Sequence, residues 1–175
     1  DILKPNKLTP SHILRLIQNL KRLHNRDLSL IFSLKTFPAE QCLKILKNLT
    51  SVSLLFSWQR NMTDHDLKKL FVRLQNLKRL SILKIDFSSC NNLALQHFLH
   101  GCKRLKNLKS LQFAFRNNEE TLNDPNIEKL FSAIAKHLPL SEFYIHFRRC
   151  STVTSHNLSK ISLCLQKLHL LTQLT

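Results

Sequence analysis

The chain has 175 residues, 43% of them hydrophobic, and its 27 Lys and Arg outnumber its 11 Asp and Glu to give a formal net charge of +16. This length suits one domain with its own core. The single glycine, Gly101, excludes P-loop, dinucleotide-binding and nucleophile-elbow sites, because their loops need glycine where backbone approaches a ligand or takes a positive φ.

Helices and strands are predicted to alternate along the chain. In chain order they are helix 10–23, strand 28–32, helix 38–48, strand 52–56, helix 64–76, strand 83–87, helix 93–103, strand 111–115, helix 125–137, strand 143–147 and helix 155–167. Strand and helix in alternation, with crossovers of this length, favour an α/β fold with parallel strands side by side.

The strands are predicted from a repeated apolar alternation in which every second residue faces the core. The five copies are Leu28-x-Leu30-x-Phe32, Val52-x-Leu54-x-Phe56, Leu83-x-Ile85-x-Phe87, Leu111-x-Phe113-x-Phe115 and Phe143-x-Ile145-x-Phe147. We expect their closing phenylalanines to stack as one internal column beneath neighbouring strands.

The helices are predicted from apolar stripes with a period of 3.6 residues and from signals at their N-termini. One stripe contains Leu67, Leu70, Phe71 and Leu74, and another contains Ile127, Leu130, Phe131, Ile134 and Leu138. Pro10, Pro38 and Pro125 suit a first helical turn, and Thr63 and Ser155 are candidate N-caps.

The closing phenylalanines are 24, 31, 28 and 32 residues apart, which fits one strand and one helix per repeat. Leucines stand seven residues before four of them, at Leu49, Leu80, Leu108 and Leu140. Leu168, Leu171 and Leu174 fit the same offsets for a strand whose phenylalanine would fall beyond Thr175. We therefore expect residues 1–175 to be a single array of about five to six repeats and a piece of a longer array.

The stretch Leu80-x-x-Leu83-x-Ile85-x-Phe87, followed by a polar loop through Cys90 to Leu93, resembles the leucine-rich repeat in its longer, ribonuclease-inhibitor-like form. The resemblance covers nearly the whole chain, although the usual asparagine after the strand is shifted or missing in most copies. It implies a solenoid (horseshoe) with parallel strands on the concave face and helices on the convex face. It also implies a scaffold for protein–protein interaction, with no enzymatic activity.

If the marked residues point inward, the residues between them form rows on the concave face. One row is Ser29, Ser53, Lys84, Gln112 and Tyr144; the next is Ile31, Leu55, Asp86, Ala114 and His146. Apolar anchors beside arginine and tyrosine are typical of binding hot spots. The candidate partner-binding residues are Ile31, Leu55, Trp58, Lys84, Asp86, Gln112, Arg116, Tyr144, His146, Arg148 and Arg149. An open alternative for Ile31 and Leu55 is that an N-terminal cap covers them.

A second candidate surface is a basic rim between helix ends and the following strands. Its candidate phosphate-binding residues are Lys21, Arg22, Lys47, Lys78, Arg79, Lys103, Arg104, Lys106 and Lys109. Such a stripe suits phosphate contacts. An alternative explanation for the placement is the helix dipole, which favours cations at helix C-termini. The dipole does not explain the size of the net charge, which suggests that either the partner or the remainder of a longer chain is acidic.

Signals for metal binding and catalysis are weak. His97 and His100 are three residues apart before Cys102, but no carboxylate stands near them in sequence, and His146 with Cys150 lacks any sign of an oxyanion hole. We expect no metal, no cofactor and no catalytic residue. The five cysteines are scattered and never spaced C-x-x-C, so we expect reduced, mostly buried thiols and an intracellular protein, cytoplasmic or nuclear.

Three functions remain open from the sequence. The first is a scaffold that binds another, acidic protein through the concave sheet and the loops at the strand ends. The second is a basic subunit of a ribonucleoprotein that contacts nucleic-acid phosphates through the lysine-rich rim. The third is a regulatory repeat region of a larger enzyme. We expect no association through a membrane-spanning segment, because no apolar run reaches roughly 18 residues.

Overall fold

The computed structural model describes residue 15 and residues 31–33, 48–56, 63–90, 100–101, 104–117 and 124–174. Within these ranges the chain forms one parallel sheet with strand order β1-β2-β3-β4-β5-β6. The strands are β1 (Ile31–Ser33), β2 (Ser51–Leu55), β3 (Ile82–Asp86), β4 (Ser110–Ala114), β5 (Glu142–His146) and β6 (Gln173–Leu174). The predicted α/β class with a parallel sheet is confirmed.

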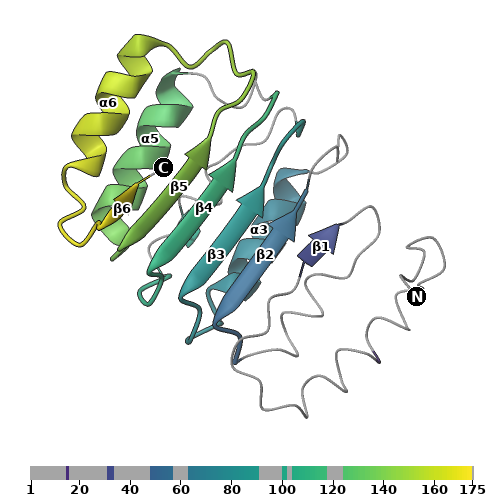
Figure 1. The fold of residues 1–175 in the computed structure, drawn as a ribbon. Coiled ribbons are helices and arrows are strands. Elements are labelled where there is room, and N and C mark those ends of the chain that lie inside the picture. The colour runs from purple at the N-terminus through teal and green to yellow at the C-terminus, as the bar shows by residue number, and fades with distance from the viewer. Residues whose placement is uncertain are drawn as a thin grey trace, which may run out of the picture.

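Three helices lie on the same side of the sheet (Figure 1). They are α3 (Asp64–Leu74), α5 (Asp124–His137) and α6 (Ser155–Leu165). Arg15 and residues 100–101 are also helical, inside the predicted helices 10–23 and 93–103, whose other residues lie outside the described part. The predicted helix 38–48 lies outside it except for Asn48, which is in a turn. We call the other side of the sheet, on which none of these described helices lies, the open face.

The predicted register is confirmed for β2 to β5. Ser53, Lys84, Gln112 and Tyr144 pair in one row, and Leu55, Asp86, Ala114 and His146 in the next. The first strand differs from the prediction, because Ile31 pairs with Ser53 rather than Leu55, and Phe32 with Leu54 rather than Phe56. The alternation sets only which face a residue occupies, and a slip of two residues leaves every side chain on the same face.

The phenylalanine column is confirmed where its side chains are described. The Phe87 ring stacks between those of Phe56 and Phe115, with centroids 5.7 and 5.6 Å apart, and the Phe115 and Phe147 centroids are 6.3 Å apart. Phe56, Phe87 and Phe115 are buried, and Phe147 is partly buried. The side chain of Phe32 lies outside the described part. The column joins the core across four successive strands.

Each helix turns its apolar stripe to this core and begins with a polar cap where one is described. The Thr63 side chain caps α3, as predicted, and Asp66 completes the capping box. In α6 the cap is Thr154 rather than the predicted Ser155, which is the first helical residue. Thr154 is selected because the residue three positions later, Asn157, can bond back to the cap backbone.

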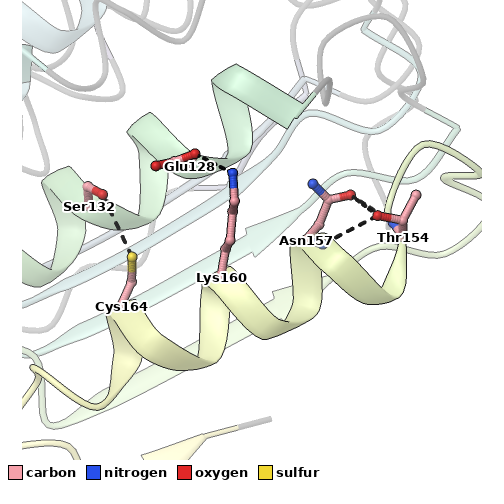
Figure 2. Close-up of polar contacts among 6 residues, drawn as sticks. All are labelled: Glu128, Ser132, Thr154, Asn157, Lys160 and Cys164. Atoms are coloured by element: carbon pink, nitrogen blue, oxygen red, sulfur yellow. Dashed lines mark hydrogen bonds and ion pairs between the residues drawn. The ribbon is translucent and has the colours of Figure 1, made fainter.

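Polar contacts also join α5 to α6 (Figure 2). Lys160 Nζ lies 2.7 Å from Glu128 Oε2, and this hydrogen bond and charge hold the pKa of Glu128 below its ordinary value. One turn further along, Ser132 Oγ and Cys164 Sγ are 3.7 Å apart. Asn157 is fully buried at the start of α6. The two neighbouring repeats are thus joined by surface polar contacts as well as by the core.

Candidate functional site

The open face carries side chains that the core does not use. Its first row places the exposed Lys84 beside Gln112 and Tyr144, and its second places Asp86 in the row of His146. Leu55, 36% exposed, begins the second row, whereas Ser53 and Ala114 are buried. Apolar surface is thus offered at one end of the rows, and Tyr144 and His146 at the other.

Beyond the ends of β3, β4 and β5 the chain forms a hollow of about 270 Å³, which we call the strand-end hollow. It is lined by Asp86, Ser88, Ser89, Arg116, Asn117, Arg148 and Arg149. Asp86 Oδ1 accepts a hydrogen bond from the backbone N–H of Ser88 at 2.8 Å, and Ser88 Oγ accepts one from the N–H of Arg116 at 3.2 Å. These bonds fix the loop after β3 and join it to the backbone of Arg116 in the loop after β4.

The three loops share one backbone conformation. Ser89, Asn117 and Arg149 have φ values of 58°, 56° and 58°, each three residues beyond the end of its strand. Backbone bonds connect the loops, from Ser89 N–H to the Arg116 carbonyl at 2.7 Å and from Asn117 N–H to the Arg148 carbonyl at 3.2 Å. Asn tolerates this left-handed region, whereas Arg is strained in it. Arg149 is therefore held in a strained conformation on the hollow.

Buried thiols support the same loops from below. Cys90 Sγ donates a hydrogen bond to the Phe56 carbonyl at 2.9 Å, and Cys150 Sγ donates one to the Phe115 carbonyl. Both cysteines are buried, as the sequence predicts. His146 lies on the open face, whereas the Cys150 thiol is directed to the carbonyl of Phe115 beneath the loops, so the two do not form a nucleophile–base pair in this arrangement.

A second hollow, of about 640 Å³, lies at the other end of the strands, where they begin. We call it the strand-start hollow. It is lined by Thr50, Lys78, Arg79, Ser81, Lys106, Asn107, Lys109, Pro139 and Leu170. A chain of backbone bonds runs under it, from the N–H groups of Ser81, Lys109, Ser141 and Thr172 to the carbonyls of Thr50, Ser81, Lys109 and Ser141. Among the residues that the structure describes, four cations and no acidic side chain line this hollow.

The helix dipole is the alternative explanation for the position of Lys78 and Arg79 in this hollow. Basic side chains occupy the last turn of α3 at Arg73 and of α5 at Lys136 and His137, but none occupies the last turn of α6. Lys78 and Arg79 follow the C-cap of α3, Gln75, by three and four residues. The dipole acts mainly within the last turn. The helix dipole therefore does not explain why Lys78 and Arg79 lie in the strand-start hollow.

Comparisons with known proteins give no relative. No protein-family model matches the chain, and no curated protein matches it. The two hollows therefore rest on the geometry and chemistry of this chain alone.

The structure brings most of the predicted partner-binding residues together. Asp86, Arg116, Arg148 and Arg149 line the strand-end hollow, and Lys84, Gln112, Tyr144, His146 and Leu55 lie in the adjoining rows. Ile31 is in β1 but two residues from its expected register. Trp58 lies outside the described part. Ser89 and Asn117 also line the hollow but were not predicted. Each lies three residues beyond the end of its strand, as Arg149 does beyond β5.

The predicted rim is brought together in part. Lys78, Arg79, Lys106 and Lys109 share the strand-start hollow, whereas Arg104 Nη1 bonds to Gln75 Oε1 at 3.4 Å outside its lining. Lys21, Arg22, Lys47 and Lys103 lie outside the described part. Thr50, Ser81 and Asn107 were missed, because short polar residues beside a strand carry no distinctive sequence signal.

The described residues contain neither a metal-binding cluster nor a helix that could span a membrane. Among the described residues there is no group of three or more His, Cys, Asp and Glu side chains that could hold a metal ion. His97 and Cys102 lie outside these residues. In the same part of the chain, every helix is too short or too polar to cross a bilayer.

Proposed function

We propose that this chain is a non-enzymatic protein-interaction scaffold that binds an acidic partner through the open face and the strand-end hollow. The observation that carries the proposal is the convergence of Arg116, Arg148 and Arg149 on one hollow, next to the row that ends in Tyr144. Arginine binds carboxylates through paired hydrogen bonds, and arginine with tyrosine is typical of hot spots in protein interfaces.

The strained backbone of Arg149 supports this proposal. A residue in an unfavourable backbone conformation lowers stability and persists only where the surrounding structure holds it in place. Such residues cluster at functional sites. Asn117 occupies the equivalent position without strain. An arginine at this position therefore contributes its charge to the hollow at the expense of some stability.

We also propose that the α/β array is a leucine-rich-repeat solenoid with its strands on a concave face. We further propose that the protein is intracellular. The repeated strand–loop geometry and the phenylalanine column support the first part, and the buried thiols of Cys90 and Cys150 support the second. A crystal structure that shows a flat or closed sheet would contradict the solenoid.

The scaffold is tested by affinity capture with three forms of the protein: the wild type, the double variant Tyr144→Ala/Arg148→Ala, and a variant in which Lys78, Arg79, Lys106 and Lys109 are changed to Ser. We expect a protein with an acidic segment to be captured by the wild type and by the serine variant, but not by the double variant. For the purified pair, loss of one hot spot weakens binding by about 2 kcal/mol, or roughly 30-fold in Kd. Equal capture by all three forms would contradict the proposal.

A further inference from the structure

The strand-start hollow has a composition unlike that of the strand-end hollow. Three lysines and one arginine line it together with Thr50, Ser81 and Asn107, and none of the described residues in its lining is aromatic or acidic. Lysine is depleted in the cores of protein interfaces, where aromatic residues and arginine are enriched. Lys and Arg with Ser, Thr and Asn are the side chains that contact nucleic-acid phosphates.

We propose that the strand-start hollow binds the phosphodiester backbone of a nucleic acid. Interfaces with nucleic acid are more polar and much more positively charged than those with protein. The described part of the lining offers no aromatic ring on which a base could stack, so binding depends on backbone charge and is independent of base sequence. The site is separate from the strand-end hollow and does not depend on the scaffold function.

Hydrogen bonds under the hollow fix the backbone turns from which the cations extend. The side chain of Asn107 donates a hydrogen bond to the Lys78 carbonyl at 2.7 Å, which ties together the two turns that carry the cations. The Lys109 N–H bonds to the Ser81 carbonyl at 2.8 Å. Pro139 and Leu170 continue the lining toward β6 without charge, so the basic stretch ends there. The charges thus form a patch on adjacent turns.

The four cations predict a definite salt dependence. Each phosphate neutralised on a single strand contributes about 0.7 to the slope of log affinity against log salt, so four contribute about 2.8. Between 50 and 200 mM salt these contacts lose roughly 50-fold in affinity. The probe is a labelled polyuridylate of about 20 nucleotides, and binding is followed by fluorescence anisotropy.

The test compares two variants of equal net charge. In the first, Lys78, Arg79, Lys106 and Lys109 are changed to Ser; in the second, Lys68, Lys69, Lys129 and Lys136, on α3 and α5, are changed to Gln. All eight side chains are exposed, so both variants should fold, and the loss of the same four charges should change their melting temperatures alike. We expect the first variant to lose about 2.8 from the slope and the second to stay close to wild type.

Three outcomes overturn the proposal. The first is an equal loss of polyuridylate binding in both variants, which would assign binding to net charge alone. The second is displacement of polyuridylate by polyglutamate as effectively as by unlabelled polyuridylate, which would make the hollow an acidic-peptide site. The third is displacement by vesicles containing phosphatidylserine, which would make it a membrane contact. Tyr144→Ala/Arg148→Ala should retain polyuridylate binding, whether or not it loses a protein partner.

Discussion

At the scale of single residues, Arg149 is the position where local structure and binding conflict. Its φ of 58° places an arginine in a region that asparagine occupies at the equivalent Asn117. The left-handed conformation costs a residue with a Cβ about 1–2 kcal/mol, and asparagine visits it more readily. The strain is local, because Ser89 and Asn117 form the same turn from different sequences.

We expect Arg149→Asn to increase the free energy of unfolding by about 1 kcal/mol and to weaken binding of the acidic partner. Stability is measured by urea unfolding and affinity by calorimetry. Arg148→Asn is the matched control, because it removes the same charge from a neighbouring residue without a positive φ. It should weaken binding without stabilising the fold. An Arg149→Asn protein less stable than wild type would argue against strain at this position.

The conformation of Arg149 could not be predicted from its own identity, because arginine has no preference for positive φ. The repeat carries the missing information. Once the strands are aligned, Ser89, Asn117 and Arg149 occupy equivalent positions, and asparagine is the one that suggests a left-handed turn. The burial of Cys90 and Cys150 was predictable, since cysteine is among the most buried residue types.

At the scale of elements, the start of α3 is sensitive to pH. The Thr63 hydroxyl donates to Asp66 Oδ2 at 2.7 Å, and the Thr63 N–H bonds to the same oxygen at 3.1 Å. The pKa of Asp66 lies below its ordinary value, mainly because its carboxylate accepts the side-chain hydrogen bond from Thr63. Burial opposes this shift, and the charges of Lys69 and His65 add to it. In α6, Asn157 occupies the equivalent place without a titratable group.

We expect Asp66→Asn to flatten the acid dependence of stability. A carboxylate whose pKa is lower in the folded state stabilises above its unfolded pKa, and the contribution is lost as pH falls through the folded value, below about pH 4. Urea unfolding between pH 7 and about pH 3 measures the difference. Asn can make the capping bonds that Asn157 makes, so stability at neutral pH should change little. An unaltered acid dependence in the variant would contradict this assignment.

The stacked phenylalanines join elements that are distant in sequence. Phe87 is fully buried, and its ring also lies 6.3 Å from that of Phe113. We expect Phe87→Ala to lower the free energy of unfolding by about 3–5 kcal/mol, because the cavity opens between two neighbouring repeats. Val72→Ala, at a position 46% exposed on α3, is the control and should change stability by less than about 0.5 kcal/mol. Comparable melting curves for the two variants would contradict the column.

At the scale of the whole molecule, the fold was largely predictable and the hollows were not. The alternation around Leu54, Ile85 and Phe113 determines which side chains face the core, and therefore which occupy the open face. It does not determine which residues pair across strands, so the predicted register of β1 against β2 differs from the observed register by two residues. A hollow depends on loop conformation in three dimensions, which explains why Asn107 and Asn117 were missed while neighbouring cations were found.

The charge of the whole chain predicts its response to salt. With 27 basic and 11 acidic side chains, folding brings like charges together, and salt shortens the screening length from about 30 Å at 0.01 M to about 8 Å at 0.15 M. We expect the melting temperature to rise with sodium chloride, by about 2–4 °C for each kcal/mol of repulsion removed. The Gln variant of Lys68, Lys69, Lys129 and Lys136 should show a smaller rise. A melting temperature that falls with salt would mean that attractive charge pairs dominate.

The burial of Asn157, which completes the capping box of α6, also restricts covalent modification. Asn157-Leu158-Ser159 is an acceptor sequence for an N-linked glycan, which is attached through the amide nitrogen of the asparagine side chain. Asn157 is 0% exposed, and its amide oxygen accepts hydrogen bonds from the N–H and the hydroxyl of Thr154, both at 2.8 Å (Figure 2). A sugar at this nitrogen would have to occupy space filled by the core. Glycosylation at Asn157 and the native start of α6 therefore exclude each other.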